Sequence, residues 1–314
     1  MTKILVTGGS GLLGSNISKI ATSRYEVFAT YNKNKVSMDN VSYFQADLSI
    51  KGDLEEIEQI KPEFIIHCAA LTNMDFCEEN PADAYNGNVL ASIHVAEVAR
   101  KIGSYLIYIS TDSVFNGEDG NYSESDIPDP ISVYGKTKLE AEQKVLSICP
   151  HSCVVRTNIY GWNKLNKFSL AEWMLNKLTN NEELPGIKDV YFSPTLVNDL
   201  AGILFKLYEG RNEGIFHIVG GESCSKLDFA YNIAEVFRLD KSVIKPINFQ
   251  ALGLKAPRGM NMSLNVTKVR EILKVDLPHV REGLEEMRML RNEGYVESLK
   301  HGKPEDYGYH PCSK

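Results

Sequence analysis

The sequence predicts a doubly wound parallel α/β sheet with a smaller C-terminal lobe that would hold a substrate. Two observations carry this prediction. Short apolar runs alternate with longer helical patterns over the first two thirds of the 314 residues, which is typical of a parallel sheet covered on both faces. A glycine-rich turn also follows the first apolar run directly. Because such sheets bind ligands at the carboxyl ends of their strands, we expect the functional site at that edge.

The expected elements follow one another along the chain. Strands are expected at residues 3–7, 26–31, 41–46, 63–69, 105–111 and 153–157, and helices at 12–22, 53–60, 81–101 and 133–147. After residue 160 the alternation weakens, with helices expected at 170–180, 198–208, 226–238, 266–273 and 280–290, and strands at 215–219 and 243–249. We therefore expect an NADP-binding domain of the Rossmann type at 1–160 and about 187–212, a substrate lobe at about 161–186 and 213–290, and a loose tail at 291–314.

Charge and hydropathy exclude several classes of protein. With 34 basic and 41 acidic residues the net charge is −7, so we expect no nucleic-acid partner and no membrane-surface binding. No apolar run reaches the ~18–20 residues that cross a bilayer, and the first residues lack a signal-peptide pattern. Six cysteines without a Cys-x-x-Cys pair indicate reduced thiols in a cytoplasmic protein. No metal site is expected, since His301, His310 and Cys312 in the tail match no standard spacing.

The turn after the first expected strand reads Thr-Gly-Gly-Ser-Gly-Leu-Leu-Gly over residues 7–14. Gly8, Gly11 and Gly14 therefore have the spacing G-x-x-G-x-x-G. Glycines let a backbone approach a pyrophosphate closely, and the following helix presents free N–H groups and the positive end of its dipole. Its position between a strand and a helix favours a dinucleotide-binding turn over an ordinary glycine-rich one.

The end of the second expected strand indicates which dinucleotide is bound. An NAD enzyme usually carries Asp or Glu there, which binds the ribose 2′-OH, whereas residues 29–35 read Ala-Thr-Tyr-Asn-Lys-Asn-Lys. A carboxylate would repel a 2′-phosphate, and Lys33 or Lys35 could attract one. We therefore favour NADP(H), with NAD(H) as the alternative if these lysines are only solvated loop charges.

Tyr134 and Lys138 form Tyr-x-x-x-Lys at the start of an expected helix. Positions i and i+4 share one face, so the phenol and the ammonium can address the same site. The charge of Lys138 would lower the pKa of the phenol, which is about 10 in an unperturbed tyrosine. Thr111 ends the strand expected at 105–111 and can hydrogen-bond a substrate oxygen, unless it is only a turn residue. Hydride transfer to a ketone leaves an alkoxide, to which such a group would supply the proton.

Four longer segments carry a family resemblance. They read Ser-Thr-Asp-Ser-Val-Phe-Asn-Gly at 110–117, Gly-Asn-Tyr-Ser-Glu-Ser-Asp at 120–126, Tyr-Gly-Lys-Thr-Lys at 134–138 and Ala-Ala-Leu-Thr-Asn-Met-Asp at 69–75. Shorter segments extend the match over about residues 1–290. In combination they resemble the dTDP-4-dehydrorhamnose reductase family of the extended short-chain dehydrogenase/reductase superfamily. The resemblance implies a bilobal reductase of nucleotide-linked 4-keto-6-deoxysugars that uses NAD(P)H.

The resemblance also implies roles for single residues. The catalytic set would be Thr111, Tyr134 and Lys138. Asp47 would contact the adenine, unless it caps the helix expected at 53–60. With the glycine turn and the end of the second strand, the expected cofactor-binding residues are Gly8, Ser10, Gly11, Leu12, Gly14, Asn32, Lys33, Asp47, Leu48, Ala69, Ala70, Tyr134, Lys138 and Thr157. On the substrate side the expected residues are Thr72, Ser113, Asn158 and Arg258.

Two departures from the family pattern fall on the substrate side. Ser113 stands where the family has Tyr, and Ala-Pro-Arg-Gly at 256–259 lacks the usual Arg-Pro order. We therefore expect reduction of a keto group on a nucleotide-linked deoxysugar, without naming the sugar or the nucleotide. The alternatives are an epimerase of the same superfamily and a non-catalytic NADP-binding subunit similar to the regulatory subunit of methionine adenosyltransferase. A homodimer is compatible with each of these functions.

Overall fold

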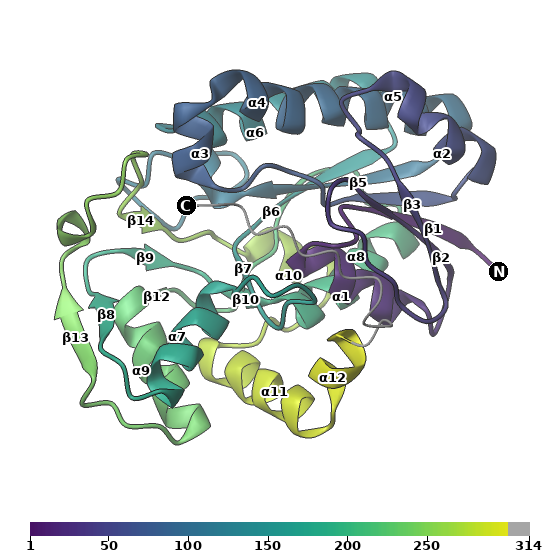
Figure 1. Cartoon of the computed structure of the whole chain (residues 1–314). Coiled ribbons are helices and arrows are strands. Elements are labelled where there is room, and N and C mark those ends of the chain that lie inside the picture. The colour runs from purple at the N-terminus through teal and green to yellow at the C-terminus, as the bar shows by residue number, and fades with distance from the viewer. Residues whose placement is uncertain (301–314) are drawn as a thin grey trace.

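The computed structural model describes residues 1–300. Its centre is a seven-stranded sheet in the order β11-β6-β5-β4-β1-β2-β3, in which all neighbouring strands are parallel (Figure 1). The strands are β1 (Lys3–Thr7), β2 (Glu26–Tyr31), β3 (Val41–Gln45), β4 (Phe64–His67), β5 (Tyr105–Thr111), β6 (Ser152–Thr157) and β11 (Gly214–His217). The prediction of a doubly wound parallel sheet is confirmed.

Two layers of helices bury the two faces of this sheet (Figure 1). Alternate residues of each strand face opposite sides. Ile4 and Val6 of β1 belong to a core with α1 (Leu12–Ala21) and α8 (Val197–Glu209). Leu5 lies between them in sequence and belongs to a separate core with α2 (Glu55–Ile60), α5 (Ala91–Ile102) and α6 (Val133–Ile148). The nearly continuous apolar runs of the strands follow from this burial on both sides.

The helix expected at 81–101 is interrupted. It forms as α4 (Pro81–Tyr85), a π-helical turn at Asn86–Leu90 and then α5, and it is preceded by the short helix α3 (Met74–Glu79). Asn88 in the π turn holds the loop after β4, because its side chain accepts from Leu71 N (2.8 Å) and donates to Leu71 O (3.2 Å). The same amide group donates to Thr137 Oγ1 (3.0 Å). The π turn therefore ties the loop after β4 to α6, and such turns are frequent at functional sites.

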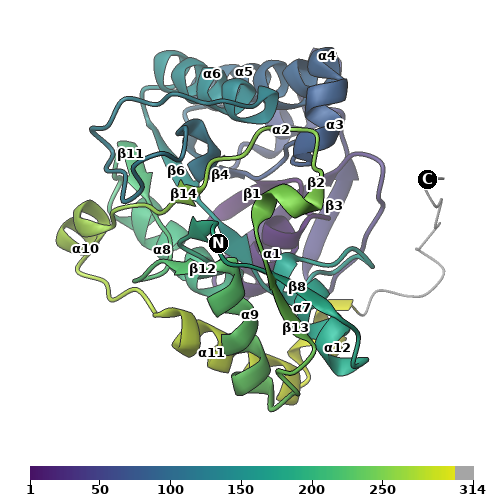
Figure 2. The ribbon, with the colours of Figure 1, turned by 90° about the vertical axis from the view of Figure 1, so that its left-hand side faces the viewer.

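A second, smaller lobe has its own apolar core (Figure 2). Its helices are α7 (Leu170–Thr179), α9 (Lys226–Phe237) and α11 (Val280–Asn292). Its strands form two small sheets, one of β8 (Leu184–Ile187) with β13 (Ile244–Ile247), and one of β12 (Cys224–Ser225), β9 (Tyr191–Phe192) and β14 (Asn261–Met262). A further short pair, β7 (Ile159–Tyr160) and β10 (Thr195–Leu196), lies where the chain first passes between the lobes. No helix within residues 1–300 is both long and apolar enough to cross a membrane.

The structure corrects two parts of the expected organisation. β11 lies within residues 213–290, which were expected in the substrate lobe, yet it pairs with β6 as an edge strand of the large sheet. The expected loose tail at 291–314 is wrong for its first part, since α12 (Tyr295–Lys300) packs on the molecule with Leu299 fully buried. Tyr295 Oη donates to Asn16 Oδ1 of α1 (2.8 Å), and Lys164 Nζ donates to Leu299 O (2.8 Å). Residues 301–314, with His301, His310 and Cys312, lie outside the described residues.

Two histidines are buried in the sheet region without charge compensation. The ring of His67 lies between Thr7 Oγ1 (2.6 Å from Nδ1) and Ser92 Oγ (3.0 Å from Nε2). His217 Nδ1 lies 2.9 Å from Tyr122 O. Burial, together with the nearby positive charges of Lys138 and Arg156 respectively, lowers the pKa of each imidazole to about 3. Both rings are therefore neutral in the folded protein at neutral pH.

These histidines predict a loss of stability in mild acid. Between about pH 6.5 and pH 3 the unfolded chain binds protons that the folded chain does not, so stability is complete above pH ~6.5 and falls below it. Each histidine contributes a slope of about 1.4 kcal/mol per pH unit. Urea unfolding between about pH 7 and pH 5.5 measures it. His217→Asn should reduce the slope, whereas His151→Asn, at an exposed position, should not; a flat wild-type profile would contradict the prediction.

Candidate active site

The glycine turn joins β1 to α1 where a ligand can approach the backbone. Gly8 has a φ of +66°, and a Cβ on it would lie 2.8 Å from Ala69 Cα. A Cβ on Gly14 would lie 2.3 Å from Gly8 O, so α1 can begin this close to the turn only with glycine there. Gly11 N donates to Gly8 O (2.9 Å), and no side chain caps the N-terminus of α1. The first N–H groups of α1, which starts at Leu12 after Ser10 and Gly11, therefore keep their capacity to bind an anion.

The residues expected around the adenosine come together beyond β2 and β3. Asn32 and Lys33 are exposed just after β2, and both lower the pKa of Asp47. The largest cause of that lowering is Ser49, whose Oγ and N donate to Asp47 Oδ1 at 2.6 and 3.0 Å. Asp47 does not cap a helix, so that alternative is wrong. Leu48 next to it is buried, and its carbonyl lies 3.0 Å from His94 Nδ1.

Thr111, Tyr134 and Lys138 meet at the carboxyl edge of the sheet. Thr111 ends β5 beside Thr157 of β6. Tyr134 and Lys138 lie in the first turns of α6, whose start is fixed by Ser132 Oγ accepting from Gly135 N (3.1 Å). Lys138 Nζ donates to Ile109 O (2.8 Å) and lies 4.1 Å from the centre of the Tyr108 ring. The three residues that the sequence proposes as catalytic are thus grouped on neighbouring elements.

Burial is the largest cause of the pKa shifts of Tyr134 and Lys138. It raises the pKa of Tyr134, which a hydrogen bond with Thr111 partly lowers and the charge of Asp112 raises further. Burial also lowers the pKa of Lys138 to about 7, against the opposing charge of Glu142. The expectation that Lys138 lowers the pKa of the phenol is therefore wrong in this structure. The ammonium faces Ile109 O and the Tyr108 ring instead, and Tyr134 remains a neutral phenol that can donate a proton.

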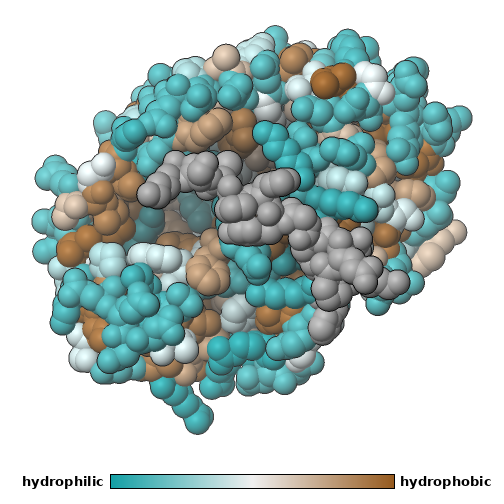
Figure 3. Space-filling view, viewed as in Figure 1, coloured by the Kyte–Doolittle hydropathy of each residue, from teal (hydrophilic) through white to brown (hydrophobic). Residues whose placement is uncertain are grey.

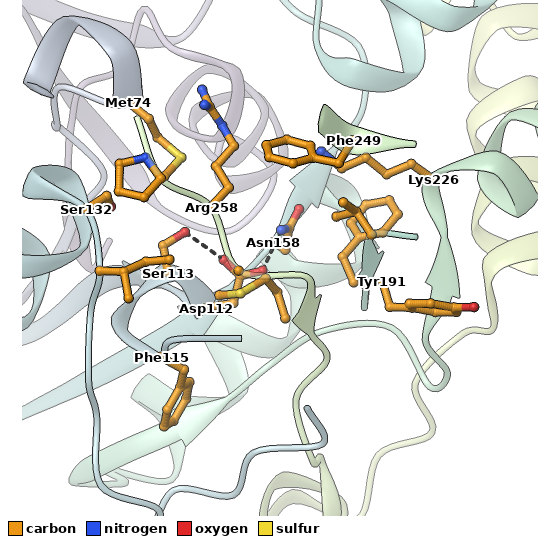
Figure 4. Close-up of a pocket in the computed structure, with 16 residues that line it drawn as sticks. Met74, Asp112, Ser113, Phe115, Ser132, Asn158, Tyr191, Lys226, Phe249 and Arg258 are labelled. Carbon is orange, nitrogen blue, oxygen red and sulfur yellow. Dashed lines mark hydrogen bonds between the residues drawn. The ribbon is translucent and has the colours of Figure 1, made fainter. Parts of the chain in front are cut away.

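A pocket of about 600 Å³, partly open to solvent, lies between the lobes beside this group (Figure 4). The hollow on the left in Figure 3 lies where Figure 1 shows α3, β9 and β14. Asp112 forms its floor: Oδ2 accepts from Asn158 Nδ2 (2.6 Å), and Oδ1 accepts from Thr111 Oγ1 (3.0 Å) and Ser113 Oγ (3.3 Å). Burial raises the pKa of the Asp112 carboxyl.

The pocket gathers three of the four expected substrate-side residues. Ser113, Asn158 and Arg258 line it, whereas Thr72 is exposed before α3 and does not. Sequence reasoning missed Asp112 and Lys226, which also line it. A polar residue directly after the strand end at Thr111 is a signal that could have indicated Asp112. Lys226 carries no sequence signal, because its approach to the pocket depends on the packing of the second lobe.

The residues present fit a dinucleotide along the carboxyl edge of the sheet. The turn at Gly8 and Gly14 has no room for a Cβ but leaves backbone N–H groups for a pyrophosphate. Ala69 and Ala70 follow β4 as small half-buried residues, and Ala69 N donates to Thr7 Oγ1 (3.3 Å). Thr157 Oγ1 is buried at the end of β6 without a hydrogen-bond partner in the described chain, which is the kind of group that a ligand satisfies. From residues 1 to 300, no group of three or more His, Cys, Asp or Glu could hold a metal ion.

The fold and the site define the class of protein. A glycine turn after β1 of a parallel sheet, with Thr111 at the end of β5 and Tyr-x-x-x-Lys on the next helix, is the arrangement of an extended short-chain dehydrogenase/reductase. The family model described as the RmlD substrate binding domain matches residues 1–291. The chain therefore belongs to this family, that of dTDP-4-dehydrorhamnose reductase, and the resemblance found in the sequence is confirmed.

Three known proteins illustrate the similarity. The chain is 30% identical over 303 residues to dTDP-4-dehydrorhamnose reductase of Aggregatibacter actinomycetemcomitans, covering 92% of this chain and 99% of the relative. It is 31% identical over 279 residues to methionine adenosyltransferase 2 subunit beta of Xenopus tropicalis, covering 86% and 82%. The crystal structure of dTDP-4-dehydrorhamnose reductase from Bacillus anthracis in complex with NADP is 28% identical, with a TM-score of 0.82 and coverage of 92% and 99%.

Proposed function

We propose that this protein uses NADPH to reduce a keto group on a nucleotide-linked deoxysugar. The observation that carries the proposal is the neutral, buried Tyr134 beside Thr111, whose chain neighbours Asp112 and Ser113 line the pocket together with Asn158. A proton donor next to a polar pocket suits a carbonyl oxygen that becomes an alcohol. The similarity to reductases over nearly the whole chain supports this reaction.

In this mechanism the residues of the chain bind the cofactor, orient the carbonyl group and donate the proton. NADPH, when bound, supplies the hydride. The glycine turn at Gly8 would hold its pyrophosphate, and Thr157 Oγ1, at the end of β6, would form a hydrogen bond with another part of the cofactor. Tyr134 would give its phenolic proton to the carbonyl oxygen, which Thr111 orients. Lys138, whose pKa is lowered to about 7, would regain its charge as negative charge develops nearby.

NADPH is expected to bind at least tenfold more tightly than NADH, a difference of about 1.4 kcal/mol. Asn32 and Lys33 lie exposed after β2, and no carboxylate is present there to hold a ribose 2′-OH. Calorimetric titration with both cofactors measures the ratio. Lys33→Glu should reduce it, and Lys206→Glu, the same charge change at an exposed position on α8, should not. Equal affinities in the wild type would overturn this choice of cofactor.

The reaction itself is tested by its stoichiometry. We expect one NADPH to be consumed for each sugar converted. The loss of absorbance at about 340 nm that accompanies hydride transfer measures the NADPH consumed, and chromatography measures the product. A dTDP-linked 4-keto-6-deoxysugar is the first substrate to try, because the family resemblance names that class. Sugar interconversion without net loss of absorbance, on protein isolated with tightly held cofactor, would favour the epimerase instead.

A second candidate function is that of a regulatory subunit. The specific observation for it is the 31% identity to methionine adenosyltransferase 2 subunit beta over 82% of that subunit. Mixing this protein with a catalytic methionine adenosyltransferase subunit tests it. A change in the kinetics of that enzyme, together with no oxidation of NADPH by any nucleotide sugar, would favour the subunit over the reductase.

A further inference from the structure

One basic side chain in the pocket has no partner. Lys226 is the first residue of α9, and its backbone is held by Lys226 N donating to Val190 O (3.0 Å) and by the capping box that Ser225 and Asp228 form around it. Its side chain extends into the pocket beside Phe249 (Figure 4). Of the residues described as lining the pocket, Lys226 and Arg258 are the basic ones, and Lys226 Nζ makes no hydrogen bond or ion pair within residues 1–300.

Arg258 is different, because its guanidinium is already bound within the protein. Its Nη2 donates to Asp75 Oδ1 (3.0 Å) and its Nη1 to Ala256 O (2.9 Å). Ala256 N donates to the same Asp75 oxygen (2.9 Å), so the strap before β14 is fastened to α3 across the cleft. Arg258 therefore serves mainly to hold this strap, and Lys226 is left as the cation that can bind a ligand.

The Asp112 carboxylate does not act as a hydrogen-bond acceptor for Lys226 Nζ. Asp112 attracts it electrostatically, yet no ion pair forms between them, and the Asp112 oxygens already accept from Thr111, Ser113 and Asn158. Burial lowers the pKa of Lys226, while the charge of Asp112 raises it. An ammonium with three N–H donors in a half-buried pocket is costly to leave without acceptors. A bound anion would supply them.

The order of charges along the pocket indicates where that anion lies. The floor at Asp112 disfavours a negative group and suits hydroxyl groups, which can donate to its oxygens. Lys226 lies apart from Asp112, beside the apolar ring of Phe249 (Figure 4). This order of charges along the pocket matches a ligand that is uncharged and hydroxylated at its reactive end and anionic in its middle. A sugar joined through a diphosphate to a nucleoside has that pattern.

We propose that Lys226 binds the diphosphate of the nucleotide-linked substrate, and so restricts the site to sugars activated in this way. The inference rests on the proposed function for the sugar end of the site, but the diphosphate contact can be measured without turnover. Lysine binds phosphate as a point charge. The contact should therefore be independent of the base and weaken with salt.

The test is calorimetric titration of the full chain with uridine diphosphate and with thymidine diphosphate, in saturating NADP⁺ so that the pyrophosphate site at Gly8 is blocked. We expect Lys226→Met to weaken both ligands at least tenfold and to a similar degree, and Lys226→Arg to recover part of the affinity. Lys245→Met, the same change at an exposed position of β13, is the matched control and should bind as the wild type does. NADP⁺ affinity and the unfolding midpoint should be unchanged in all three variants.

Unchanged diphosphate affinity in Lys226→Met would overturn the proposal, as would wild-type affinity that does not fall between low and high salt. The salt series uses the wild type alone, so the proposal stays testable if Lys226→Met does not fold. The same experiments distinguish this contact from the reductase function. If diphosphate binding depends on Lys226 but the protein oxidises no NADPH with any keto-sugar, the contact is supported and the proposed reaction is contradicted.

Discussion

Replacing Tyr134 by Phe is expected to lower kcat by about 10²–10⁴-fold, the range for a lost general acid, while NADPH binds as before. The ring packs in a small apolar cluster with Cys77 and Ala84, against Leu71 and Met74. Phe preserves this packing and removes only the hydroxyl. Since burial keeps the phenol protonated at neutral pH, the lost group is the proton donor itself.

Steady-state kinetics with NADPH and a keto-sugar, with separate calorimetry for cofactor binding, measure both parts of this expectation. Tyr85→Phe is the matched control, because Tyr85 is a 42% exposed tyrosine at the end of α4, outside the site. Turnover of the Tyr134 variant at the wild-type rate would show that another group donates the proton. A loss of turnover together with a loss of NADPH binding would indicate damage to the site rather than to the chemistry.

Replacing Arg156 by Met is expected to destabilise the fold by about 3–5 kcal/mol, the cost of leaving a buried charge without its partner. Arg156 in β6 and Glu142 in α6 are both about 1% exposed. Nε donates to Glu142 Oε1 (3.0 Å) and Nη2 to Oε2 (2.8 Å), and Ser110 Oγ donates to Oε1 (2.5 Å). The variant keeps the Glu142 carboxylate in the core with only Ser110 as a donor.

Denaturant unfolding at neutral pH measures this loss, and a second substitution identifies its origin. Adding Glu142→Leu to the Arg156 variant should recover much of the stability, because neither charge is then buried alone. Lys101→Met is the control: its ion pair with Glu58 is exposed and should contribute less than about 1 kcal/mol. A loss for Arg156→Met as small as that of the control would mean that water or a neighbouring group replaces the guanidinium.

The parts of this protein that were predictable from sequence depend on local patterns. The glycine spacing after β1 and the i, i+4 spacing of Tyr134 and Lys138 are read within a few residues. The sheet brings them to one edge because every strand is parallel and its carboxyl end points the same way. Thr111 could be placed beside them for the same reason, as the last residue of β5.

The parts that were not predictable depend on contacts between distant segments. Residues 291–300 have no apolar period, and α12 is held by Leu299 and by the hydrogen bond of Tyr295 to Asn16, 279 positions away. The pocket residue Lys226 comes from a different lobe than Asp112. The direction of the Tyr134 pKa shift depends on burial and on where Lys138 Nζ points, neither of which the Tyr-x-x-x-Lys spacing contains.

The late position of β11 in the chain has a consequence for synthesis on the ribosome. The large sheet cannot be completed when residue 160 emerges, since its last strand is Gly214–His217 and one covering helix is Val197–Glu209. Until then β6 remains an open edge and the face that α1 shares with α8 is only partly covered, which exposes the nascent chain to mispairing. Segments of the second lobe are translated between β6 and β11, so the two lobes must complete their folding together. A cofactor-binding module cut at residue 160 for transplantation into another protein should therefore fail unless residues 188–219 travel with it.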